Sequence, residues 1–236
     1  MVQENNKIAP LAVLQARMGS SRLPGKTMYE INGRPMIDYV LESLLTIFKK
    51  EQLIIVTSVS SNNDPIRDYA FKNNISVYSG HEENVASRYF DVLNERNEIS
   101  HMFRFCADTP LYDMSVVKKG LEVIGSSDVE VVTSIPNKGF PMGCNVEIIT
   151  REVFMKGYSQ FSKPEHFEHV MGYFYENKEE FNVQFVSCDA KDYSYEKVKF
   201  SVDTEEDLSM IISVLKKMNY NPLNYSFSDK FELLKK

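Results

Sequence analysis

Apolar runs and helical patterns alternate along the first 134 residues of this chain. Runs typical of buried strands lie at 8–16, 52–58, 75–80, 100–107 and 128–134, and helical patterns lie between them at 35–48, 64–74, 82–96 and 113–124. Such alternation favours a mostly parallel sheet with helices on both faces. The length of 236 residues suits one domain, so we predict a single-domain α/β fold with an open sheet.

The regular alternation of strand and helix patterns ends after residue 135. We expect a strand at 140–149, helices at 150–160 and 164–178, and strands at 183–188 and 197–202. A further helix at 204–218 opens with a capping box formed by Thr204 and Asp207. The tail at 219–236 is predicted to be a turn-rich link and a short terminal helix.

Charge and composition exclude several classes of protein. The net charge of −6 lacks the basic excess of a nucleic-acid binder. No apolar run approaches the roughly 20 residues of a membrane span, and the polar N-terminus does not resemble a signal peptide. The cysteines are Cys106, Cys144 and Cys188, and their wide spacing suggests reduced thiols. We therefore expect a cytoplasmic protein that binds neither nucleic acid nor membrane.

The stretch ARMGSSRLPGKT at 16–27 looks like a phosphate-binding P-loop but departs from that motif. Five residues, not four, separate Gly19 from Gly25, and the Asn32-Gly33 turn leaves no room for the long helix that a P-loop requires. The loop still follows the first strand and carries three cations. Arg17, Arg22 and Lys26 are suited to a polyphosphate, with Ser20 or Ser21 as additional donors.

Two aspartates follow apolar segments and are candidate metal ligands. Asp108 ends the strand that precedes Thr109-Pro110, and Asp203 precedes the capping residue Thr204. Ligands of open α/β sheets bind beyond the carboxyl ends of the strands. Carboxylates there, opposite a cationic loop, predict a site for nucleotide-bound Mg²⁺.

Other metal and nucleophile patterns are weak. His166 and His169 lie three residues apart and resemble half of a zinc site, but no third ligand follows at a recognisable spacing. No G-x-S-x-G elbow or Ser-His-Asp order supports a hydrolase.

Six successive stretches resemble the motifs of the sugar-acid cytidylyltransferases, especially the branch labelled spore-coat polysaccharide biosynthesis protein. They are LQARMGSSRLPGK, SGHEENVASRYFDVL, RFCADTPLYD, FPMGCNVEII, EHVMGYFYEN and KFSVDTEEDL. The similarity runs from about residue 8 to 215, and the tail from 218 to 236 lies outside it. The resemblance implies a nucleotide-diphospho-sugar transferase-like fold and transfer of CMP from CTP to a sugar acid or related hydroxyl, with release of pyrophosphate.

The resemblance also implies roles for individual residues. Nucleotide contacts would come from Ala16, Arg17, Ser20, Arg22, Lys26 and Gly80, Mg²⁺ ligands would be Asp108 and Asp203, and acceptor contacts would come from Asn145, Glu168 and His169. Of these, Arg17, Lys26 and the two aspartates would carry the chemistry. The choice of cytosine rests on the resemblance alone.

Several positions depart from the family pattern. Ala107 stands where Gly is usual, Asn84 and Asn145 stand where Asp is usual, and a basic residue is common near Met142. These changes leave the acceptor open. Asn84 and Asn145 also leave open a non-catalytic nucleotide-binding relative. A glycosyltransferase of similar fold would need a metal-binding D-x-D pair, whereas CADTP and SVDTE each contain a single Asp, and a plain structural domain would bind no nucleotide. Family members are often homodimers, and the aromatic residues of 165–177 suggest an interface.

Overall fold

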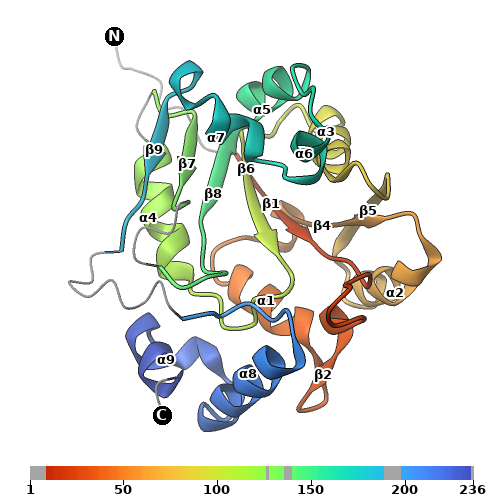
Figure 1. The fold of residues 1–236 in the computed structure, drawn as a ribbon, viewed down its shortest axis with the longest axis vertical. Helices are drawn as coiled ribbons and strands as arrows, with labels where there is room; N and C mark the ends of the chain where they lie inside the picture. The colour runs from red at the N-terminus through yellow and green to blue at the C-terminus, as the bar shows by residue number, and fades with distance from the viewer. Residues whose placement is uncertain (1–8, 126–127, 136–139, 189–197, 235–236) are drawn as a thin grey trace.

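The computed structural model describes residues 9–125, 128–135, 140–188 and 198–234, so positions 8 and 197 of two predicted strands lie outside it. Its described part contains a seven-stranded sheet in the order β5-β4-β1-β6-β8-β7-β9 (Figure 1). The parallel strands are β1 (Pro10–Gln15), β4 (Leu53–Ser58), β5 (Ser76–Gly80) and β6 (His101–Cys106). Their carboxyl ends therefore meet at one edge of the sheet.

The second half of the sheet is mixed. Strand β8 (Glu147–Thr150) runs antiparallel to both β6 and β7 (Val131–Thr133), and β9 (Val183–Phe185) is parallel to β7. The predicted strand at 140–149 is wrong in its first half, since the chain turns at Gly143, where φ is +96°. The predicted strand near 197–202 is reduced, among described residues, to a parallel bridge between Met142 and Lys199.

Helices cover both faces of the sheet, as the alternation predicts. One apolar cluster joins the strands to α1 (Met36–Leu44), α2 (Asp64–Lys72) and α4 (Met114–Ile124). The opposite cluster joins them to α3 (Val85–Asn94), α5 (Arg151–Tyr158) and α7 (Gly172–Glu176). Side chains of each strand point alternately to the two clusters, which explains the continuous apolar runs.

The predicted helix at 164–178 is two short helices. Helix α6 (Pro164–Glu168) ends at His169, and α7 begins at Gly172. The aromatic residues that suggested an interface belong to the core. Tyr173 and Phe174 are buried against Phe161 and Phe181. They supply no exposed apolar face, and the homodimer stays a prediction.

A third apolar cluster lies beyond the carboxyl edge of the sheet. Helix α8 (Glu205–Lys217) packs beside α9 (Phe227–Leu234) at the foot of Figure 1. Thr204 caps α8 as predicted, with Asp207 N–H donating to its hydroxyl at 3.2 Å. Within the described residues, none of the helices combines the length and apolar character needed to cross a membrane.

Candidate active site

The glycine loop leaves the end of β1 and is held in shape by backbone contacts. The N–H of Ala16 donates to Val56 O at 3.0 Å, and Gly25, with φ of +75°, donates to Met18 O at 2.9 Å. The Thr27 hydroxyl closes the loop by donating to Arg17 O at 2.9 Å. A left-handed conformation at Gly25 suits glycine, which has no Cβ to clash.

The loop ends in one 3₁₀ turn rather than a long helix. The turn covers Lys26–Met28 and leads into a hairpin of β2 (Glu30–Ile31) and β3 (Arg34–Pro35). Asn32 and Gly33 both have positive φ at its tip, as two-residue hairpins require. The prediction that this is not a P-loop is therefore confirmed.

The Lys26 ammonium joins both predicted metal ligands. Its Nζ lies 2.8 Å from Asp108 Oδ2 and 3.0 Å from Asp203 Oδ1, and it donates to Val202 O at 2.6 Å. Lys26 is only 9% exposed, so these ion pairs are screened far less than surface pairs. The loop therefore meets the end of β6 and the segment before α8 at one point.

Two more cations surround Asp203. Lys199 Nζ lies 2.9 Å from Asp203 Oδ2, and Arg22 Nη2 lies 3.1 Å from Oδ1. Burial alone would raise the pKa of Asp203, but the hydrogen bonds and charges of Lys199 and Lys26 lower it to about 2. Lys199 also binds Asp207 of the capping box. Lys199 opens the stretch KFSVDTEEDL but was not among the predicted site residues.

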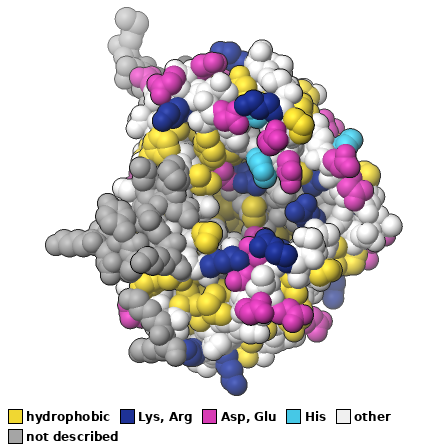
Figure 2. Space-filling model, viewed as in Figure 1, with side chains coloured by type: hydrophobic (Ala, Val, Ile, Leu, Met, Phe, Trp, Pro, Cys, Tyr) yellow, Lys and Arg dark blue, Asp and Glu magenta, His cyan; other side chains and the backbone are white. Residues whose placement is uncertain are grey.

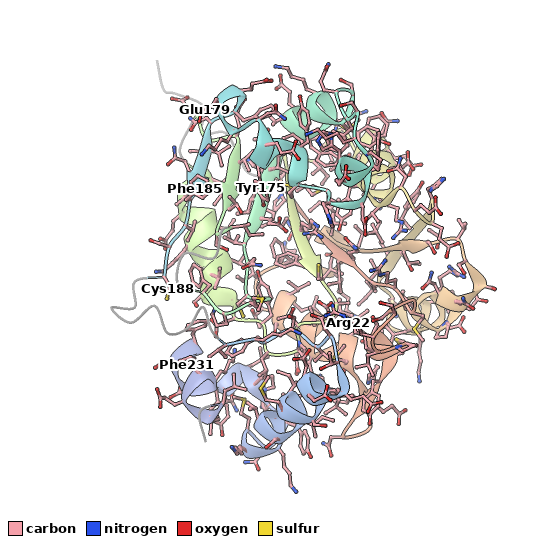
Figure 3. All side chains as sticks on the ribbon, in the orientation of Figure 1. Arg22, Tyr175, Glu179, Phe185, Cys188 and Phe231 are labelled. Atoms are coloured by element: carbon pink, nitrogen blue, oxygen red, sulfur yellow. The ribbon has the colours of Figure 1, made fainter. Side chains whose placement is uncertain are left out.

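A cavity of about 170 Å³ lies at the carboxyl edge of the sheet, beside Lys26 and Asp203. Its lining includes the predicted phosphate and metal residues Arg17, Ser20, Arg22, Lys26, Asp108 and Asp203. In Figure 3, Arg22 lies between the ends of the central strands and α8. Figure 2 shows a hollow on this face with basic and acidic side chains along its lower edge. The arrangement offers cations for phosphates and carboxylates for a metal in one place.

A second cavity of about 180 Å³ adjoins the first and shares Cys106 and Asp108 with it. Its wall contains Arg104, whose Nη1 lies 2.5 Å from Glu147 Oε2, and the predicted acceptor residue Asn145. The buried Asn145 Oδ1 has no hydrogen-bond partner in the described structure. Burial raises the pKa of the Cys106 thiol to about 11, although the positive charge of Arg104 acts in the opposite direction. This cysteine is therefore not an activated nucleophile.

A third cavity, of about 100 Å³, lies on the other side of Arg17 and contains Arg88. Gly80 lies behind Arg88, since a Cβ at Gly80 would come within 3.0 Å of Arg88 Cγ. Asn84 caps α3 by accepting from Ser87 N–H at 2.8 Å, which gives this departure from the family pattern a structural role. Arg88 was missed from the sequence because it lies within an ordinary helical pattern.

The remaining predicted residues lie apart from these cavities. Ala16 is buried at the end of β1, and neither Glu168 nor His169 is among the residues that line the first two cavities. His166 is buried with Nε2 at 3.3 Å from Glu176, whereas His169 is exposed at the end of α6. The two histidines therefore do not share a face, which removes the half zinc site.

Asp108 and Asp203 fit a hard divalent cation by the chemistry of their donors. Carboxylate oxygens are the ligands that Mg²⁺ prefers, and it needs only one or two of them when phosphates complete its shell. Both carboxylates already converge on a single positive charge, the Lys26 ammonium. Among the described residues, no group of three or more His, Cys, Asp or Glu side chains is arranged to hold a metal ion, so phosphate oxygens would have to contribute.

Comparisons with known proteins agree with this geometry. The family model described as cytidylyltransferase matches residues 11–226. The spore coat polysaccharide biosynthesis protein SpsF of Bacillus subtilis is 25% identical, over 95% of this chain and 93% of its own length. A structure described as a cytidylyltransferase from Leptospira borgpetersenii has a TM-score of 0.87 and 26% identity, and covers 97% of this chain and 94% of its own.

A more distant structure shares the fold. It is described as CMP:2-keto-3-deoxy-manno-octonic acid synthetase complexed with CTP, and has a TM-score of 0.64 with 18% identity over 89% of this chain and 99% of its own. Because the family model spans most of the chain, including every residue that lines the first cavity, this protein belongs to the cytidylyltransferase family.

Proposed function

We propose that this protein transfers CMP from CTP to a hydroxyl group of a small sugar acid or related acceptor and releases pyrophosphate. The observation that carries the proposal is the contact of Lys26 with Asp108 and Asp203, which gathers the cationic loop and both carboxylates at one cavity. The family match and the CTP complex of the synthetase that shares this fold support CTP as the donor.

The cations of the first cavity would stabilise the departing pyrophosphate. The acceptor oxygen forms a bond to the α-phosphorus and loses its proton to solvent, while the bond from that phosphorus to the bridging oxygen breaks. Negative charge then grows on the β- and γ-phosphates, where Arg17, Arg22 and Lys26 are placed to offset it. Arginine is suited to this task because its planar donors match phosphate oxygens in pairs.

Asp108 and Asp203 would hold the Mg²⁺ of the nucleotide. When bound, this ion would neutralise charge on the attacked phosphate. The carboxylates also keep Lys26 extended at the cavity, since its stem is buried and its ammonium contacts both of them. Lys26 is thus positioned for phosphate by the same residues that would bind the metal.

The second cavity is the proposed acceptor site. It adjoins the first through Cys106 and Asp108, so an acceptor there would lie next to the phosphates. The unpartnered Asn145 Oδ1 is suited to accept a hydrogen bond from an acceptor hydroxyl. Glu168 and His169, which the resemblance placed at the acceptor, gain no support from the lining of this cavity.

Pyrophosphate release tests the proposal. Purified protein is mixed with CTP, Mg²⁺ and a panel of 2-keto sugar acids, and pyrophosphate is measured with wild type and with Lys26→Met. Release that needs one acceptor and is lost in the variant would support cytidylyl transfer. CTP binding without release across the panel would favour the non-catalytic relative. The predicted homodimer and cytoplasmic location are separate proposals, and light scattering of the purified protein tests the dimer.

A further inference from the structure

Gln15, the last residue of β1, has an amide whose oxygen is held by the protein and whose nitrogen is not. Its Oε1 accepts from the Tyr89 hydroxyl at 3.0 Å and from Arg104 Nη2 at 3.3 Å. A guanidinium can only donate, so the atom that faces Arg104 must be the amide oxygen. Nε2 is therefore turned away from Arg104, and it makes no hydrogen bond among the described residues.

The free amide nitrogen is accessible from the phosphate cavity. Gln15 is partly exposed and lines this cavity together with Lys26 and Asp108. Its backbone carbonyl is already used, since it accepts from Ala107 N–H at 3.0 Å. Nε2 is not one of the fully buried side-chain atoms that lack a partner. It is therefore the polar atom of Gln15 that a ligand in the cavity can reach.

A row of polar side chains across the sheet fixes the orientation of this amide. Arg104 Nη1 lies 2.5 Å from Glu147 Oε2, and the Tyr175 hydroxyl donates to Glu147 Oε1 at 2.6 Å. Glu147 is 7% exposed, so solvent screens the ion pair little. Arg104 is thus held in place beside Gln15. Turning the amide over would set its NH₂ group against the donors of Arg104 and Tyr89.

Gln15 lies where the α-phosphate of a bound nucleotide would be. It pairs in the sheet with Cys106, which lines both the phosphate cavity and the proposed acceptor cavity. Gln15 is not among the residues that line the acceptor cavity. The loop cations Arg22 and Lys26 are the proposed partners of the departing phosphates. The group between the departing phosphates and the acceptor is the α-phosphate.

Given the proposed use of CTP, on which this inference rests, we propose that Gln15 Nε2 donates a hydrogen bond to one non-bridging oxygen of the α-phosphate. Gln15 would then be a catalytic residue, because it touches the group that is transferred. Its donor is oriented before the nucleotide binds, so no reorganisation is needed during the reaction. Tyr89 acts only through Gln15 and is a positioning residue.

The test compares three ligands: CTP and the two diastereomers in which sulfur replaces one non-bridging α-phosphate oxygen. Their dissociation constants are measured by titration calorimetry with Mg²⁺, so no acceptor is needed. Gln15→Met should weaken CTP and one diastereomer by about 10- to 100-fold, since a hydrogen bond to a charged oxygen is lost. The other diastereomer, with sulfur opposite Nε2, should bind nearly as it does to wild type. Effects of sulfur on Mg²⁺ occur in both proteins and cancel from this ratio.

Two further variants make the test independent of Gln15→Met. Gln15→Glu keeps the shape of the side chain but presents an oxygen to the phosphate, so it should bind CTP more weakly still. Tyr89→Phe removes one of the two donors that orient the amide. It should weaken the same two ligands by a smaller factor and leave the third unchanged, which a loss of packing alone would not do.

Gln52→Met is the matched control. Gln52 lies just before the amino end of β4, and its Oε1 accepts from Lys49 N–H at 3.0 Å. It is not among the residues that line the phosphate cavity. This variant should bind all three ligands as wild type does.

Two results would overturn the inference and leave the proposed function standing. One is an unaltered affinity of Gln15→Met and Gln15→Glu for all three ligands. The other is equal weakening of all three, which would mean that Gln15 only shapes the cavity. A wild type that binds neither CTP nor its thio analogues would instead overturn the proposed function, and this inference with it.

Discussion

The Nζ atom of Lys26 lies 3.0 Å from Oδ1 of Asp203, although the two residues are 177 positions apart in the chain. The loop after the first strand is thereby tied to the segment that opens α8. The lysine side chain in this contact is 10% exposed and the aspartate side chain is 24% exposed. It makes the geometry of the phosphate cavity depend on both ends of the fold.

Replacing Lys26 with Met should reduce turnover by about 10²- to 10³-fold, because one preorganised cation at the leaving pyrophosphate is lost. The measurement is the rate of pyrophosphate release at saturating CTP. Lys199→Met is the control, since Lys199 also binds Asp203 but is not among the residues that line the phosphate cavity. Equal losses in the two variants would mean that Lys26 acts only through Asp203.

Replacing Asp203 with Asn should destabilise the protein at pH 7 and not at low pH. The folded pKa of about 2 lies below the ordinary value of 3.8, so the charged form stabilises the fold above pH 4 and this contribution is lost as the pH falls toward 2. This difference between the two pKa values corresponds to about 2 kcal/mol in the free energy of unfolding. Urea unfolding of wild type and variant at pH 7 and pH 2.5 measures it. A difference that does not shrink at pH 2.5 would contradict this account.

Gly80→Ala should displace Arg88, because the new Cβ would lie 2.8 Å from Tyr78 Cε1 and 3.0 Å from Arg88 Cγ. We expect a loss of roughly 1–3 kcal/mol in the free energy of unfolding. Gly19→Ala is the control, since a Cβ there meets nothing within 4 Å. Urea denaturation measures the free energy of unfolding of the two variants. Equal values would show that the side chains around Gly80 move aside at no cost.

Lys230→Met should destabilise the protein by about 3–5 kcal/mol, because it leaves the buried Asp113 carboxylate without its partner. Lys230 is 3% exposed, and its Nζ lies 2.9 Å from Asp113 Oδ2. Phe231, labelled in Figure 3, is buried on the same helix. Helix α9 begins just beyond the family match, and this test asks whether it is part of the core.

The double variant Lys230→Met, Asp113→Asn should recover much of that loss. The amide keeps an oxygen for Ser115 N–H, which caps α4, and removes the unpaired charge. A double variant as unstable as Lys230→Met would point to lost packing rather than to the charge.

Local patterns predicted most of the parallel half of the fold. Strands β1 and β4 are largely apolar runs because both of their faces are buried, and Pro65 marks the start of α2. The antiparallel direction of β8 is not visible in its residues, since it depends on where the chain turns at Gly143. The prediction of one helix at 164–178 was wrong because α6 and α7 share one apolar periodicity across the break at His169.

The phosphate cavity was predictable because its cations lie in one loop and its carboxylates follow apolar segments, of which the one before Asp108 is strand β6. Arg88, Arg104 and Lys199 were not predicted, although each lies in one of the stretches that carry the family resemblance. Their partners in the fold cannot be derived from their positions in those stretches. The Arg104–Glu147 pair joins neighbouring antiparallel strands, and that pairing could not be derived from sequence.

Thermal unfolding with CTP, UTP, ATP and GTP, each with and without Mg²⁺, tests the central claim most directly, because it needs no acceptor. A ligand at 100 times its dissociation constant adds about 2.7 kcal/mol, or roughly 5–10 °C for a chain of this size. We predict a shift of this order for CTP, strengthened by Mg²⁺ and larger than for the other nucleotides. No shift with CTP, or a larger one with another nucleotide, would contradict the assignment of this cavity to cytidylyl transfer.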